Sequence, residues 1–133
     1  TYYGGDMGVT GGKSFKQWVL DAGSFDRTRF HFTGTVPAAE LAELFGLSDL
    51  HVYLTVPFVL SWSLLNALAC GAPVLASDTA PVREVIRPGD TGVLTDFYDA
   101  DAMADRISEV LDRPQDYRHL GRNGADLIRR EYS

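Results

Sequence analysis

The chain has 133 residues and a formal net charge of −6, and its Lys and Arg are dispersed rather than clustered. This length predicts one domain at most, and a hydrophobic content of 45% is ordinary for a globular fold. An acidic chain without a basic face argues against a nucleic-acid partner, because such affinity comes from neutralising phosphates. No apolar run approaches the roughly 20 residues that span a bilayer, so we expect no transmembrane segment. The single cysteine, Cys70, excludes a disulfide within the chain and fits a reducing cytoplasm.

The first third of the chain predicts a loop, a helix and a strand. Residues 1–12 are rich in glycine, but their spacing fits neither a Walker loop nor a G-x-G-x-x-G turn. We interpret them as a loop after a strand that lies before Thr1. Ser14 is expected to cap a helix that runs to about Ala22 and is closed by Gly23. The alternating β-formers of residues 29–33 predict a strand.

The middle of the chain predicts two more helices and two more strands. A helix is expected over residues 38–46 and a strand over residues 50–55. In the central stretch, Ser61 is expected to cap the next helix, and Gly71 lies just past its end. The leucines at helical spacing, which should face a core, are Leu60, Leu64, Leu65 and Leu68. Residues 73–76 then form an apolar run that is typical of an interior parallel strand.

The polar segment 77–80 follows the carboxyl end of that strand, which is the edge where open α/β sheets bind ligands. The rest predicts a short helix at 81–86, a strand at 92–95, a helix at 99–111 capped by Asp99, and a last helix at about 116–131. We expect Gly121 and Gly124 to weaken the last helix. Strands that alternate with helices predict an α/β fold with a parallel sheet.

Several segments of the chain resemble the family 4 retaining glycosyltransferases, which have the two-domain GT-B fold. The resembling segments are Ala-Leu-Ala-Cys-Gly-Ala-Pro-Val-Leu-Ala-Ser at 67–77, Arg-Glu-Val-Ile at 83–86, Gly-Asp-Thr-Gly-Val-Leu at 89–94, and two upstream strands at 32–36 and 48–54. The likeness runs from about Arg29 to the end of the chain. It implies a Rossmann-like parallel sheet with flanking helices in a single partial domain over residues 1–133, with residues 1–12 as the glycine-rich loop and 29–133 as the family-like core.

The resemblance also implies a position for each strand. In the Rossmann order 3-2-1-4-5-6, the four predicted strands would be strands 3 to 6 of the C-terminal, nucleotide-sugar domain. Strands 1 and 2 would lie before Thr1. The strand at residues 29–33 must then slide beside residues 50–55 or leave a gap in the sheet.

The donor site that the resemblance implies begins at the N-terminus of the central helix. The amides of Ser61, Trp62 and Ser63 would meet the diphosphate of a nucleotide sugar, because free N–H groups and the helix dipole favour an anion there. Ser61 is explained equally well as an ordinary N-cap. Two further positions, Thr79 and Ala80, would approach the phosphate or sugar from the loop after the buried strand.

Both signature glutamates of the family are replaced in this chain. Phe58 stands at the first position, where it cannot act as an acid and is better explained by packing. Asn66 stands at the second, where an amide accepts a ribose hydrogen bond roughly half as strongly as a carboxylate. The alternative is that Asn66 is a partly buried polar residue without a ligand. Glu84 matches a third family glutamate, either as a donor contact or as an acid that satisfies nearby backbone.

The remaining reactive residues have structural interpretations. Cys70 is expected to be a small buried hydrophobe. No two of the histidines have metal-ligand spacing, and we interpret His31, His51 and His119 as structural. Trp18 and Trp62 could stack on a base, but packing in a core is the commoner role of an aromatic side chain.

We therefore expect the donor-binding half of a hexosyltransferase that serves saccharide biosynthesis. Its partners would be a UDP- or GDP-sugar and the N-terminal acceptor domain of the same protein, with a saccharide or lipid-linked acceptor and no cofactor or metal. Its location would be cytoplasmic, with peripheral contact at the inner membrane face allowed, and the fragment alone should be inactive. One alternative is a degenerate binding or scaffolding domain. A weaker one, a flavodoxin-like or receiver domain, would need an acidic cluster at the end of the first strand, and neither Asp78 nor Asp99 and Asp101 lie there.

Overall fold

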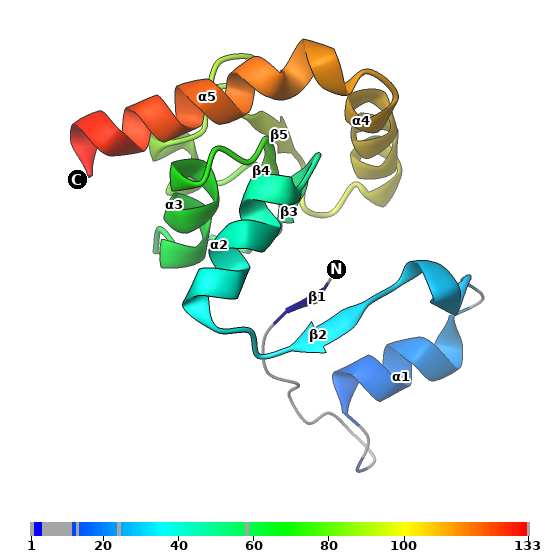
Figure 1. Ribbon diagram of the computed structural model, residues 1–133. Coiled ribbons are helices and arrows are strands. Elements are labelled where there is room, and N and C mark those ends of the chain that lie inside the picture. The colour runs from blue at the N-terminus through cyan, green and yellow to red at the C-terminus, as the bar shows by residue number, and fades with distance from the viewer. Residues whose placement is uncertain (1, 4–11, 13, 24, 58, 133) are drawn as a thin grey trace. The chain divides into compact units, whose positions relative to one another are not determined.

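The computed structural model describes residues 2–3, 12, 14–23, 25–57 and 59–132 (Figure 1). Contacts divide the chain into two compact units, Thr1–Leu41 and Ala42–Ser133. In chain order the elements are β1 (Tyr2–Tyr3), α1 (Phe15–Ala22), η2 (Arg27–Arg29), β2 (Phe32–Gly34), α2 (Ala38–Leu47), β3 (His51–Tyr53), α3 (Trp62–Ala69), β4 (Val74–Ser77), η3 (Val82–Glu84), β5 (Val93–Thr95), α4 (Ala100–Asp112) and α5 (Pro114–Glu131).

The first unit contains a pair of parallel strands and one helix. Strand β1 pairs with β2 through Tyr2 opposite Phe32 and Tyr3 opposite Gly34. The prediction that the strand before the glycine-rich loop precedes Thr1 is therefore wrong, because Tyr2–Tyr3 is itself a strand. The rest of that loop, residues 4–11, lies outside the described residues. Helix α1 begins as predicted, since the Ser14 hydroxyl accepts a hydrogen bond from the Gln17 amide at 3.1 Å.

Strand β2 begins three residues later than predicted. The Asp26 carboxylate accepts a hydrogen bond from the Thr28 amide at 3.0 Å and caps the 3₁₀ turn η2, which occupies Arg27–Arg29. The predicted slide of this strand beside residues 50–55 is also wrong. Strand β2 hydrogen-bonds to β1, whereas β3 pairs with β4 in a separate sheet.

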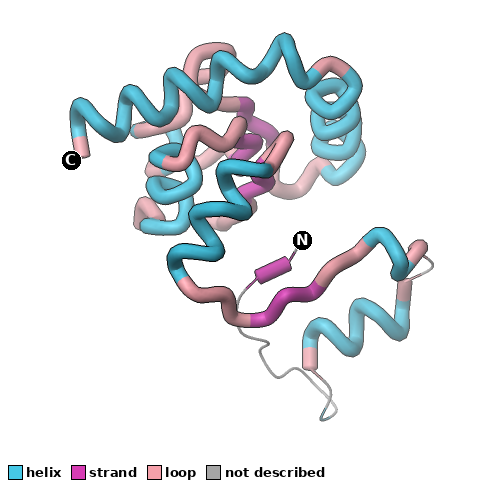
Figure 2. The backbone as a smooth tube through the Cα atoms, viewed as in Figure 1, coloured by secondary structure: helices cyan, strands magenta, loops and turns pink. Residues whose placement is uncertain are grey.

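The second unit is built on the three-stranded parallel sheet β3-β4-β5. Its central strand has a fully buried run from Val74 to Ser77. His51 lies opposite Val74 on one side of β4, and Ser77 lies opposite Thr95 on the other. Helix α3 connects β3 to β4, and the 3₁₀ turn η3 lies between β4 and β5. Helix α5 contacts both α3 and α4 (Figure 2). The predicted α/β architecture with a parallel sheet and flanking helices is confirmed.

Helices α3 and α5 pack closely because α5 has glycine at the contact. A Cβ on Gly121 would lie 2.1 Å from the carbonyl oxygen of Gly71, and one on Gly124 would lie 2.8 Å from Leu68 Cδ2. Gly71 has φ +77°, as the predicted helix end requires. Gly121 and Gly124 therefore have a packing role that their low helix propensity does not show.

Two predicted helices differ from the structure in extent. Residues 81–86 contain only the 3₁₀ turn η3, with Pro81 at its N-cap. Helix α5 begins at Pro114 rather than near residue 116. Proline lacks an amide and has a fixed φ, so it suits the first helical position, and here it starts a helix as well as ending the preceding one.

Candidate donor-binding site

Helix α3 connects the carboxyl end of β3 to the amino end of β4, so its N-terminus lies at the carboxyl edge of the sheet. The Ser61 hydroxyl caps it by accepting a hydrogen bond from the Ser63 amide at 3.1 Å. Of the three amides predicted to meet a diphosphate, that of Ser63 thus already has an acceptor. Because a helix gives its first amides no intrahelical partner, those of Ser61 and Trp62 are the ones best suited to a ligand.

One face of α3 remains open to solvent from its first residue. Trp62 is 80% exposed, and Asn66, one helical turn further along, is exposed on the same face. The prediction that Trp62 packs in a core is wrong, and so is the alternative that Asn66 is partly buried. The opposite face carries the core residues Leu64, Leu65, Ala67 and Leu68. An aromatic ring and an amide are therefore presented together beside the capped helix end.

The loop after β4 contains a buried hydroxyl without a partner. Thr79 is 7% exposed, and its Oγ1 forms no hydrogen bond within the described part of the chain. A buried polar atom of this kind is costly unless a ligand or water satisfies it. Ala80 and Glu84 follow on the same loop, and both are exposed. Phe58, the remaining predicted position, lies outside the described residues.

Three residues to which the sequence analysis gave no individual role, Ser77, Asp78 and Arg83, shape this edge of the sheet. The Ser77 hydroxyl accepts a hydrogen bond from the Thr55 amide at 2.7 Å and joins the ends of β3 and β4. Asp78 and Arg83 form an ion pair across the loop, at 2.5 and 2.7 Å. The hydrogen bond from Arg83, assisted by its charge, lowers the pKa of Asp78. The only sequence signal for this pair is opposite charge at a separation of five residues.

The histidines and the cysteine, which the sequence analysis interprets as structural, differ in their burial. His51 is buried with its ring 4.9 Å from Phe45 in an edge contact, and burial lowers the pKa of His51 to about 4. His119 Nε2 lies 3.1 Å from the Gly89 carbonyl oxygen, and His31 is exposed. Cys70 is only half-buried, which corrects its predicted burial. Within the described ranges, no group of three or more His, Cys, Asp or Glu side chains is arranged to hold a metal ion.

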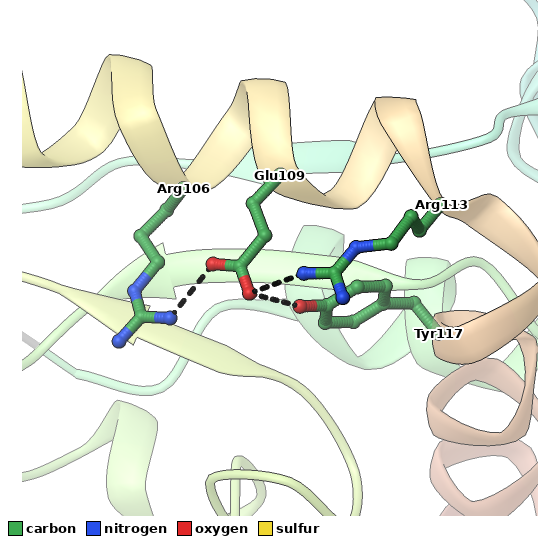
Figure 3. A network of polar contacts seen from close by, with 4 residues as sticks. All are labelled: Arg106, Glu109, Arg113 and Tyr117. Atoms are coloured by element: carbon green, nitrogen blue, oxygen red, sulfur yellow. Dashed lines mark hydrogen bonds and ion pairs between the residues drawn. The ribbon is translucent and has the colours of Figure 1, made fainter.

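Two charged regions of the second unit lie apart from the predicted residues. A hollow of about 560 Å³ is lined by Arg87, Asp90, Thr91, Asn123, Asp126, Arg129 and Arg130. Arg129 pairs with Asp126 at 2.6 Å and Arg87 with Glu131 at 3.8 Å, so carboxylates offset two of the three arginines that line the hollow. Elsewhere, Glu109 accepts hydrogen bonds from Arg106, Arg113 and Tyr117 (Figure 3).

Comparisons with known proteins agree on one family. The family described as glycosyl transferases group 1 matches residues 8–127. The N-acetyl-alpha-D-glucosaminyl L-malate synthase of Bacillus anthracis is 30% identical over 92 residues, which are 69% of this chain and 24% of that protein. The chain thus spans about a quarter of the length of this relative.

None of the helices in the described part of the chain has the length and apolar character needed to cross a membrane.

Solved structures show the same fold. The crystal structure of Anabaena Alr3699/HepE in complex with UDP-glucose has a TM-score of 0.76 at 20% identity, over 89% of this chain and 32% of that one. The C-terminal domain of a glycosyl transferase group 1 family protein (LpcC) from Francisella tularensis has a TM-score of 0.73 at 21% identity, over 89% of this chain and 60% of that one. The expected GT-B, Rossmann-like fold is therefore confirmed.

Proposed function

The chain belongs to the group 1 glycosyl transferases, and we propose that it is the donor-binding half of a two-domain hexosyltransferase. The observation that carries the proposal is the carboxyl edge of the β3-β4-β5 sheet. There a capped helix N-terminus, which favours an anion, lies at the same edge as a loop with the buried hydroxyl of Thr79, which has no hydrogen-bond partner among the described residues. The similar fold of Anabaena Alr3699/HepE, which was solved with UDP-glucose, supports a nucleotide sugar as the ligand.

Each site residue has a role in this proposal. The amides of Ser61 and Trp62 hold the diphosphate and stabilise the charge that develops on it as the hexosyl group leaves. Ser63 completes the cap. Asn66 accepts a hydrogen bond from the ribose as a neutral acceptor. Thr79 and Ala80 approach the phosphate or sugar from the β4 loop. Glu84 contacts the sugar from the end of that loop.

The proposal also covers the complete protein. An N-terminal domain supplies the acceptor, a saccharide or a lipid-linked sugar, and the donor is a UDP- or GDP-sugar. The fixed N–H groups at the helix end do the work of a metal ion, so the reaction requires neither a metal nor a cofactor. The location is cytoplasmic, with peripheral contact at the inner membrane face allowed.

A degenerate, non-catalytic module is the second candidate. It is favoured by the replacement of both signature glutamates, by Phe58 and Asn66. A neutral amide on the exposed face of α3 binds a ribose hydroxyl more weakly than a carboxylate does. In this alternative the chain binds a nucleotide sugar, or a protein partner, without transferring the sugar.

A thermal-shift titration with UDP-, GDP- and ADP-glucose tests the proposal. A ligand that binds only the folded state raises its stability by about 2.7 kcal/mol at 100 times its Kd. We expect a shift with one nucleotide sugar, which would also identify the base. A cooperative melt that none of the three ligands moves would count against a donor site and favour the degenerate module.

A further inference from the structure

An ion pair joins the two ends of the loop that follows β4. Arg83 Nε donates to Asp78 Oδ1 at 2.5 Å, and Arg83 Nη2 donates to Asp78 Oδ2 at 2.7 Å. This is the two-point geometry in which the arginine fork matches a carboxylate, and it restrains orientation as well as distance. The pair lowers the pKa of Asp78 and raises that of Arg83, so both groups are charged at neutral pH.

Backbone hydrogen bonds join the same loop to the sheet and stabilise its own fold. The Asp78 amide donates to the Thr95 carbonyl oxygen at 2.8 Å, which attaches the start of the loop to β5. The Arg83 amide donates to the Thr79 carbonyl oxygen at 3.0 Å. The ion pair therefore brackets Thr79, whose buried hydroxyl has no hydrogen-bond partner in the described ranges. The ion pair and these hydrogen bonds therefore restrain the segment that carries the Thr79 hydroxyl.

We propose that Asp78 and Arg83 are a positioning pair, which holds the loop of residues 78–84 so that Thr79 and Ala80 are presented to the donor. This inference rests on the proposed function. In this proposal Arg83 acts through the loop, with two of its five N–H groups directed at Asp78. The alternative is that Arg83 leaves Asp78 and binds the diphosphate itself.

The exposure of the pair determines how its loss should be measured. The Arg83 side chain is 64% exposed and that of Asp78 is 34% exposed. Ion pairs this close to solvent contribute little to global stability. Removal of either partner should therefore leave the melting temperature almost unchanged and should appear instead in the order of the loop and in donor affinity.

The first experiment needs no ligand. Hydrogen exchange of the full-length protein is compared for the wild type, Asp78→Asn and Arg83→Met, over the amides of residues 79–86. We expect exchange on the order of tenfold faster in both variants, because local opening controls exchange in such loops. Unchanged exchange in both variants would overturn the proposal.

The matched control is Arg113→Met. Arg113 pairs with Glu109 at 3.1 Å, and the side-chain exposures of 56% and 34% resemble those of the loop pair (Figure 3). Glu109 keeps Arg106 and Tyr117 as partners. This variant loses one exposed arginine of an ion pair without altering the β4 loop, so exchange at residues 79–86 should equal that of the wild type. An equal rise in the exchange rate of these amides in Arg113→Met would show a general charge effect and would contradict the proposal.

The second experiment measures the affinity of the same full-length variants for UDP, GDP and ADP by calorimetry, and the comparison uses the nucleotide that the wild type binds. We expect the Kd to rise on the order of tenfold for Asp78→Asn and for Arg83→Met, since small misplacements of binding groups are costly. The double variant should bind no worse than either single variant, because both substitutions break the same interaction. Arg83→Lys, which keeps the charge but not the fork, should fall between the wild type and Arg83→Met.

The pattern of losses separates the possible outcomes. Weaker nucleotide binding in Arg83→Met with normal binding in Asp78→Asn would mean that Arg83 contacts the diphosphate directly, and would overturn the positioning role. Failure of the wild type to bind UDP, GDP or ADP would contradict the proposed function. In that case the exchange experiment alone decides whether the pair holds the loop.

Discussion

Thr79 is a residue at which stability and binding should respond in opposite directions. Its hydroxyl is buried and unpaired in the described chain, so the folded protein bears the desolvation cost of a polar atom. We expect Thr79→Val, which replaces the hydroxyl with a methyl group, to stabilise the ligand-free protein by about 1 kcal/mol. Under the proposed function, the same substitution should weaken the binding of a nucleotide sugar. Denaturant unfolding and calorimetric titration measure the two effects.

Thr91 provides the matched control for that substitution. It is 2% exposed, but its Oγ1 donates to the Val85 carbonyl oxygen at 2.7 Å and accepts from the Arg87 amide at 2.8 Å. Thr91→Val should therefore destabilise the fold by about 1–3 kcal/mol, because two buried backbone groups lose their partner. If both valine variants were destabilised equally, the Thr79 hydroxyl would have to be satisfied in the native protein.

His51 makes stability depend on pH. Burial lowers its pKa from 6.5 to about 4, so between these values the unfolded chain binds more protons than the folded one. The stability is fully present above pH 6.5 and decreases as the pH falls towards 4, by roughly 3 kcal/mol at most. Unfolding measured from pH 7.5 to pH 4.5 should show a smaller loss for His51→Gln than for the wild type. The control is His31→Gln, at an exposed histidine, which should keep the wild-type dependence of stability on pH. Identical pH profiles for His51→Gln and the wild type would contradict the role of His51.

At the scale of elements, the packing of α5 against the turn that follows α3 depends on the absence of one side chain. A Cβ on Gly121 would meet the Gly71 carbonyl oxygen and carbon at 2.1 and 2.9 Å, and backbone atoms cannot move aside as a flexible side chain can. We expect Gly121→Ala to destabilise the second unit by about 2–4 kcal/mol despite the higher helix propensity of alanine. Thermal or urea unfolding measures the change.

Gly46 is the control, because it is also a helical glycine, on α2. A Cβ there meets nothing within 4 Å, and its φ is not positive. Gly46→Ala should stabilise the fold by about 0.5–1 kcal/mol, as propensity predicts. If Gly121→Ala destabilised the fold no more than Gly46→Ala does, α5 would not pack as closely as it does in the structure.

The elements that the sequence predicts well are those that local residues determine. Ser14, Ser61 and Asp99 cap their helices as expected, because a cap is an interaction over two or three residues. Strand β1 could not be predicted, because its two residues are stabilised by pairing with β2, some 30 residues away. The same limit applies to the site. The sequence predicts the N-terminus of α3 and the loop after β4 as parts of the site. It does not predict the exposure of Trp62 or the pairing of Asp78, because both depend on tertiary structure.

For the whole molecule, the two candidate functions differ in how they treat Asn66. A working transferase has adapted to an amide at the ribose, whereas a degenerate module has lost a carboxylate that it no longer needs. In the complete protein, we expect Asn66→Ala to weaken donor binding about fivefold, the loss of one neutral hydrogen bond. Asn66→Glu should give no gain in transfer if Asn66 is already the working residue, as the first proposal has it.

Asn123→Ala is the control for the Asn66 variants, since Asn123 lies on α5 and hydrogen-bonds to Asp90 rather than to the carboxyl edge of the sheet. It should leave transfer and donor affinity at the wild-type level. A large gain in transfer for Asn66→Glu would contradict the first proposal, because a single restored charge would then recover lost chemistry. Such a gain would favour the degenerate module, in which the fold and the rest of the site are kept after the loss of the ribose-binding carboxylate.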